Sequence, residues 1–149
     1  MADIVTVNVD TRKLQKVLAD FGARADAVNI EGIVGEAVLT AMDDLVESNG
    51  NGEWADFSPA TFEMHPRRVG GELLRDTGQL VAFQILTIPG RATVRSPAPY
   101  AEYHQKGTRK LRGWVSSDDH GIPKRDFTAI DMKATLDEAC ATIVSEISR

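Results

Sequence analysis

The chain is poor in cysteine, in aromatic residues and in long apolar runs. Cys140 is the single cysteine among 149 residues, so no disulfide can form within the chain. No apolar run approaches the roughly 20 residues of a membrane-spanning helix, and the first residues lack the basic start and apolar stretch of a signal peptide. We therefore expect a soluble protein that is made in the cytoplasm and that has no membrane partner.

Recognised catalytic and metal-binding spacings are also missing. The three histidines, His65, His104 and His120, stand at no spacing from carboxylates or cysteine that is typical of a catalytic or metal site. Asp118 and Asp119 precede His120, but adjacent residues in an extended loop point their side chains in different directions. The sequence has no glycine-rich phosphate loop and no nucleophile elbow. We therefore predict a protein that is not an enzyme and that has no cofactor or metal; the alternative is a metal-dependent hydrolase.

The chain does have enough apolar sequence for a single core. A length of 149 residues with 42% hydrophobic content can bury one core without disulfides or metal. We predict one domain over residues 1–149. Cys140 falls on the apolar stripe of the last predicted helix, which suits a small core-facing side chain.

Charge is distributed unevenly along the chain, whose net charge is −5. Residues 25–66 contain nine acids and no lysine or arginine, whereas residues 67–125 contain eleven bases and five acids. Two interpretations stand. The segments can simply form two solvated faces, or the acidic face of one subunit can meet the basic face of its neighbour, a head-to-tail contact that closes into a ring when the rotation permits.

Periodicity in the first third predicts a strand followed by two helices. Valines alternate with polar residues over 5–9, the period of a half-buried strand. Apolar residues then recur at helical spacing over Leu14–Phe21 and over Ile30–Val46, and the second run ends before the breaker sequence 48–52. Gly32 and Gly35 inside the second helix either mark close packing or a bend, or are a pair that the helix merely tolerates.

The middle of the chain predicts a loop rich in anchors. Ser58 and Pro59 signal one short helix. Trp54 and Phe57 either pack onto the core of the domain or belong to a subunit interface, where buried aromatic residues are enriched. Gly78 stands in a turn where a positive φ is needed.

The rest of the chain predicts a hairpin and two more helices. A β-prone run over 79–88, the turn Pro89-Gly90 and a return strand over 91–96 form the hairpin. A short helix opens at Pro99 and stops at Gly107, with Tyr100, Tyr103 and His104 on one side. The last helix begins after a cap at 128–131 and buries a stripe of Leu136, Cys140, Ile143, Val144 and Ile147. The predicted class is α+β, a small antiparallel sheet with a hairpin packed against two long helices and a C-terminal helix.

Four motifs occur in a particular order along the chain. They are Trp-Ala-Asp-Phe-Ser-Pro-Ala-Thr at 54–61, Leu-Leu-Arg-Asp-Thr-Gly-Gln-Leu at 73–80, Pro-Tyr-Ala-Glu-Tyr-His-Gln-Lys-Gly-Thr at 99–108 and Ile-Pro-Lys-Arg-Asp-Phe at 122–127. Together they resemble the virion morphogenesis, or tail-completion, proteins of Mu-like contractile-tailed phages. One departure is the insert 109–121, because the family keeps a short loop there.

The resemblance implies a structural protein of a tailed phage or prophage. Such a subunit acts at the head-tail junction, completes the tail or neck, and works as a closed ring, which the family implies is a hexamer. The implied partners are further copies of itself, the tail tube or terminator, and the head-connector proteins, with DNA at most passing through the ring. The implied location is the virion, after assembly in the cytoplasm of the bacterial host. A tail-terminator at a different level of the tail is the alternative within assembly.

A cluster of basic residues around one tryptophan is the candidate interface with a partner or a second subunit. Its members are Lys106, Arg109, Lys110, Arg112, Trp114, Lys124 and Arg125. Cations beside an aromatic ring can also hold a single nucleic-acid strand, so a small DNA-binding protein that uses the 106–125 loop is another alternative. Against it, the sequence pI is near 5.2 and two aspartates follow the cluster.

Overall fold

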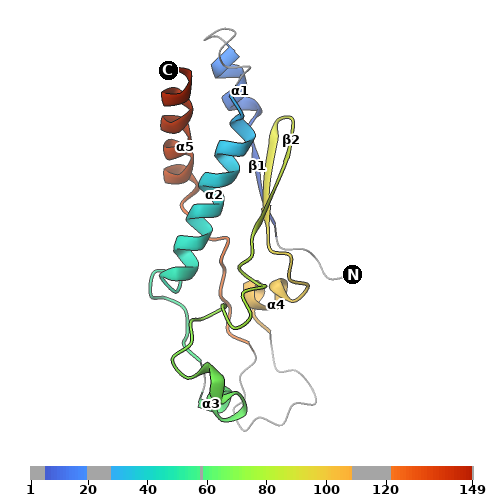
Figure 1. Ribbon diagram of the computed structural model, residues 1–149, viewed down its shortest axis with the longest axis vertical. Coiled ribbons are helices and arrows are strands. Elements are labelled where there is room, and N and C mark those ends of the chain that lie inside the picture. Colours follow the sequence, from blue (N-terminus) through green and yellow to red (C-terminus); the bar gives the residue numbers. More distant parts are fainter. Residues whose placement is uncertain (1–5, 20–27, 58, 109–121, 149) are drawn as a thin grey trace.

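The computed structural model describes residues 6–19, 28–57, 59–108 and 122–148, and these form an α+β fold, as the sequence predicted. Figure 1 shows an elongated molecule with the sheet on one side of the longest helix and the C-terminal helix on the other. In chain order the elements are β1 (Thr6–Asp10), α1 (Arg12–Ala19), α2 (Ile30–Glu47), α3 (Pro59–Met64), the 3-10 helix η2 (Pro66–Arg68), β2 (Gln84–Ile88), β3 (Arg91–Arg95), α4 (Ala101–Lys106) and α5 (Met132–Ile147).

The three strands form one antiparallel sheet in the order β1-β3-β2. The predicted hairpin is confirmed, with Pro89-Gly90 as its turn and Gly90 at φ 79°. Its tip is fixed to the rest of the protein by Glu31, whose carboxylate accepts a 2.8 Å hydrogen bond from the Gly90 N–H, and by Thr11, whose N–H donates to the Gly90 carbonyl at 3.1 Å. The start of α2 therefore determines where the hairpin lies.

The core lies between the sheet and α2 and continues to α5. Alternate residues of each strand face α2, which explains why Val9, Ala92 and Val94 are buried. From α2, Val34, Val38 and Met42 are almost completely enclosed, and Ile143 of α5 closes the other side. One apolar cluster thus joins all three layers.

Gly35 allows α2 to approach the sheet closely. A Cβ atom at this position would lie 2.6 Å from Cγ2 of Ile85 on β2, nearer than side chains tolerate. Close packing, one of the three interpretations of this glycine, is therefore confirmed. Gly32 instead lies beside its own helix cap, where its N–H donates to the side chain of Asn29 at 2.9 Å.

The first strand of the hairpin begins later than predicted. The β-prone run starts at Gln79, but β2 begins at Gln84, and residues 79–81 form a turn. Leu80 is buried in that turn, and its carbonyl accepts a 2.6 Å hydrogen bond from the hydroxyl of Ser96. Because the Ser96 hydroxyl binds this carbonyl, Leu80 belongs to an anchored loop, although the sequence pattern placed it in a strand.

The buried face of α5 is also turned relative to the prediction. Thr135, Ala139 and Ile143 are the buried residues, whereas Val144 of the predicted stripe is 57% exposed. The helix begins as expected, because Asp131 caps it by accepting from the Ala134 N–H at 3.0 Å. Small residues at 135 and 139 let α5 lie close to α2, a packing preference that hydrophobicity does not reveal.

The two remaining short helices lie toward the far end of the molecule. α4 begins after Tyr100 and ends before Gly107, whose φ of 71° stops it. Tyr100 and His104 meet, with ring centroids 6.1 Å apart, but Tyr103 is 54% exposed and does not share their side. The other predicted short helix is α3. Its Phe62 packs edge to face against Phe57, which precedes the helix, with ring centroids 5.7 Å apart.

At Gly78 the effect of backbone strain can be tested separately from that of side-chain packing. It has φ 74°, as predicted, and a Cβ added there would meet no atom within 4 Å. We expect Gly78→Val to lower the free energy of unfolding by about 1–3 kcal/mol, because a β-branched residue is strained at positive φ. Gly78→Asn should cost less, since asparagine tolerates this region. Urea titration of both variants measures the difference; equal stabilities would show that strain at Gly78 is not the cause.

Candidate functional site

Segments from three of the four sequence motifs come together around Arg125, which lies in the segment between residue 122 and α5. Its Nε and Nη2 donate to the carbonyl oxygen of Ala55 at 3.2 and 2.8 Å, and its backbone N–H donates to the carbonyl oxygen of His104 at 2.7 Å. The arginine therefore links the first, third and fourth motifs. We call the group of Ala55, His104, Thr108, Ile122 and Arg125 the Arg125 junction.

Arg125 corrects one part of the predicted interface. The sequence placed it among exposed basic residues, but it is only 5% exposed. Burial lowers the pKa of its guanidinium, and the charge of Asp56 opposes this effect. Arginine suits the position because its planar group can make two hydrogen bonds to one oxygen while its stem is covered. Arg125 is a framework residue and not part of a free surface.

The third and fourth motifs are also joined on each side of the insert. The Thr108 N–H donates to the Ile122 carbonyl at 2.9 Å, and the Ile122 N–H donates to the Thr108 hydroxyl at 3.0 Å. Gly107 is required for this approach, since a Cβ there would lie 2.9 Å from the backbone nitrogen of Lys124. The two ends of the insert are thus held together by the described residues that flank it.

His104 lies beside Arg125 inside the junction. Desolvation lowers the pKa of its imidazole, and the charges of Arg125 and Arg68 lower it further. Its Nδ1 atom is buried and has no hydrogen-bond partner. The ring is therefore held neutral by its surroundings, which suits a packed position against Tyr100 and two cations.

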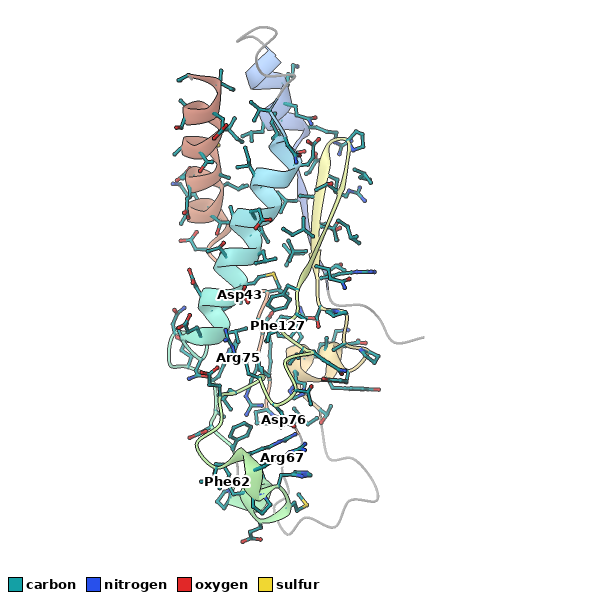
Figure 2. All side chains as sticks on the ribbon, viewed as in Figure 1. Asp43, Phe62, Arg67, Arg75, Asp76 and Phe127 are labelled. Atoms are coloured by element: carbon teal, nitrogen blue, oxygen red, sulfur yellow. The ribbon has the colours of Figure 1, made fainter. Side chains whose placement is uncertain are left out.

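The second motif contains Asp76, which forms a separate cluster with two arginines and whose role the sequence analysis missed. Its carboxylate accepts hydrogen bonds from Arg68 at 2.6 Å and from Arg67 at 3.2 Å. The hydrogen bond from Arg68 is the main reason that the pKa of Asp76 is lowered. Figure 2 shows Asp76 and Arg67 together between α4 and α3. Two adjacent arginines in a short 3-10 helix were the available signal, but nothing local identified their partner.

Above the junction, Phe127 connects the fourth motif to the core. Its ring is 1% exposed and lies 5.8 Å from the ring of Phe83. Next to it, the Thr128 hydroxyl accepts from the side chain of Gln105 at 2.8 Å and donates to Asp126 at 2.7 Å. Figure 2 places Phe127 at the height of Asp43, where α2 passes the base of the hairpin.

A shallow hollow of about 290 Å³ lies beside this segment. Trp54 and Lys124 line it, together with Asp126, which pairs with Lys124 at 3.5 Å. Trp54 packs against the core, and its indole ring lies so close to Gly50 that a Cβ there would be 2.3 Å from Nε1. Packing onto the core, one of the two interpretations of Trp54, therefore holds within the chain, and the hollow leaves part of the ring accessible.

The seven predicted interface residues are distributed unequally. Lys106 and Lys124 are exposed at the rim of the junction, where Lys106 pairs with Glu102 one helical turn away. Arg125 is inside it. Arg109, Lys110, Arg112 and Trp114 lie outside the described residues, as do Asp118, Asp119 and His120.

The described residues offer little for metal chemistry. Within residues 6–19, 28–57, 59–108 and 122–148, no group of three or more histidine, cysteine, aspartate or glutamate side chains is placed to hold a metal ion. None of the described helices is both long and apolar enough to span a bilayer. The arrangement at the junction consists of hydrogen bonds that join distant segments.

The framework role of Arg125 can be tested by replacing it with methionine, an uncharged unbranched residue. We expect Arg125→Met to lower the free energy of unfolding by about 1–3 kcal/mol, because the Ala55 carbonyl loses both of its donors. Arg125→Lys should not restore it, since an ammonium cannot reproduce the planar pair of donors. The exposed neighbour provides the control: Lys124→Met should change stability by less than about 0.5 kcal/mol. Denaturant titration decides, and equal effects at 124 and 125 would remove Arg125 from its framework role.

The lowered pKa of His104 predicts how stability depends on pH. In the unfolded chain the imidazole gains its proton near its ordinary pKa of 6.5, but in the folded protein it does so only at lower pH. The stability contribution of the neutral ring is therefore complete above pH 6.5 and is lost as the pH falls through the lowered folded value. His104→Phe keeps a ring against Tyr100 and should flatten the fall in melting temperature below pH 6.5. His65→Gln is the control and should keep the slope; a wild-type slope in His104→Phe would contradict this account.

Comparison with known proteins identifies no family for this chain. No family model, no curated protein and no solved structure gives a significant match to the chain. Any functional conclusion therefore rests on the residues themselves and on how the structure brings them together.

Proposed function

We propose that this protein is a structural subunit of a tailed phage or prophage, which completes the tail or neck at the head-tail junction. The observation that carries the proposal is that Arg125 joins three of the four motifs. Segments that are as much as 70 residues apart in the chain meet at Arg125. Three motifs that jointly build one junction support treating the motifs as parts of one folded framework.

The roles of the motif residues also favour a framework over chemistry. Arg125 and Phe127 are buried, Leu73 and Leu80 belong to the core side, and Asp76 is held by two arginines. A base does lie beside Arg125, but it is His104, whose ring packs against Tyr100 and whose Nδ1 atom is buried. In this proposal the motif residues serve folding and assembly.

The surface that remains around the junction is suited to contact with other proteins. Lys106 and Lys124 each have a side chain that is 64% exposed, and the hollow beside Trp54 lies next to Lys124. In the proposed ring, which is a hexamer, this rim faces the tail tube or terminator and the head-connector proteins. The unequal charge of the chain supports head-to-tail contact between subunits, because such a contact uses two different patches.

Loss of the gene tests the proposal in the phage or prophage that encodes this chain. Without the protein, we expect filled heads and tails of normal length that fail to join, and electron microscopy of lysates distinguishes these from complete particles. Supplying the wild-type chain should restore joining, and the tagged chain should be found at the neck of the restored particles.

Three other outcomes would contradict the proposal. Tails of irregular or excessive length would indicate a tail-terminator. Joined, infectious particles in the absence of the protein would remove it from head-tail joining altogether. Retention of the purified chain on DNA with strong salt dependence, together with its absence from particles, would favour the DNA-binding alternative.

A further inference from the structure

Among the described residues, one face of the sheet is left largely open. Most strand residues that point toward α2 are covered, whereas Asn8 on β1, Leu86 on β2 and Arg91 on β3 point away and are exposed. Thr93 and Arg95 on the same face of β3 are half-buried. In register, the outward row at the hairpin turn is Asp10, Arg91 and Ile88, and the row at the other end is Thr6, Arg95 and Gln84. Figure 1 shows β2 at the edge of the molecule farthest from α5.

The open face combines exposed apolar side chains with positive charge. Leu86 and Ile88 are 46% and 58% exposed, and β2 contains no charged residue or proline that would protect a sheet edge. Arg91 and Arg95 lie next to them on the central strand. The outward carboxylate, Asp10, pairs with Arg12 and also stands opposite Arg91, so it offsets part of the charge of Arg91 but not that of Arg95.

The opposite side of the molecule has complementary properties. α5 lies across α2 from the sheet, and its outward surface carries Val144, which is 57% exposed. Asp137, Glu138 and Ala141 are exposed on the same helix. This surface is therefore narrow and contains small and apolar residues. It keeps a net negative charge, because α5 has three acids, Asp137, Glu138 and Glu146, against one base, Lys133, which pairs with Asp137 at 2.8 Å.

We propose that the open sheet face binds the outward surface of α5 from a second copy of this chain. Val144 and Ala141 of one subunit would cover Leu86 and Ile88 of the next, and Asp137 and Glu138 would face Arg91 and Arg95. Charge complementarity determines the orientation, since sheet against sheet would place arginines against arginines and α5 against α5 would place carboxylates together. Because the two patches lie on opposite sides of the subunit, each copy can bind two neighbours.

This inference rests on the proposed function for its occupant, a second copy, and adds where the subunits meet. It is independent of the basic cluster that the sequence analysis selected, since the described members of that cluster lie near α4. A contact between two different patches also leaves a free patch at each end of any open chain of subunits, so association continues until the ring closes.

Charge reversal in trans tests the contact. The full chain is examined by sedimentation velocity at low salt over a range of concentrations. We expect the wild type to associate and to dissociate as salt rises, because exposed charges are screened. Arg91→Glu with Arg95→Glu, and separately Asp137→Lys with Glu138→Lys, should each weaken association at least 100-fold. An equimolar mixture of the two variants should associate again, because every junction then pairs opposite charges.

Matched variants control for net charge and separate this inference from the proposed function. Glu63→Lys with Glu72→Lys changes the charge as the α5 variant does, but near α3, and should associate like the wild type. If Lys106→Glu with Lys124→Glu abolishes association while the sheet and α5 variants do not, self-association stands and this interface is wrong. A wild type that stays monomeric throughout, or a mixture that stays monomeric, also overturns the inference, whereas the gene-loss experiment tests the proposed function separately.

Discussion

The buried guanidinium of Arg125 is the interaction on which the lower half of this protein depends. The sheet, α2 and α5 share an apolar core, but the segments around α4 contribute few large apolar side chains to it. Their positions are set by hydrogen bonds, and Arg125 makes those that span the largest distances along the chain. A charged group is costly to bury, so this position is stable only while its donors find acceptors.

The two halves of the molecule therefore differ in how they are stabilised. Hydrophobic packing holds the half that contains the sheet, where Gly35 permits α2 to approach Ile85 and Glu31 fixes the hairpin tip. Polar contacts stabilise the half that contains α3 and α4, where Asp76 forms ion pairs with Arg67 and Arg68. Burial raises the pKa of Asp43, and the charge of Arg75 opposes this effect. Polar networks depend strongly on geometry, so this half is suited to presenting a fixed surface to partners.

Local sequence patterns predicted the helices and strands well where each element buries one clear apolar face. The alternating valines of β1, the long apolar stripe of α2 and the Pro-Gly turn gave the sheet and its main helix, and the α+β class followed. The pattern failed where a distant group changed the outcome. Leu80 belongs to a loop because Ser96 takes its carbonyl, and α5 turns its small residues inward because α2 is close.

The candidate site was predictable only in part. The motifs identified the segments that form it, but Lys-Arg-Asp at 124–126 has the composition of a surface loop, and the partner that buries Arg125 is a backbone carbonyl 70 residues away. No local pattern marks such an acceptor. The pairing of Asp76 with the two arginines of the 3-10 helix was equally hard to predict, since two adjacent positive charges in the sequence do not indicate which carboxylate binds them.

Hydrogen exchange measured residue by residue is the most direct test of the claim that Arg125 unites the motifs. The amides of Thr108 and Arg125 donate within the junction, whereas the ladder of β1 and β3 belongs to the apolar half. In a protein that carries Arg125→Met, the account predicts that the junction amides lose protection together while the β3 amides keep theirs, as expected of a separate cooperative unit. Unchanged protection at Thr108, or an equal loss across the whole sheet, would contradict it.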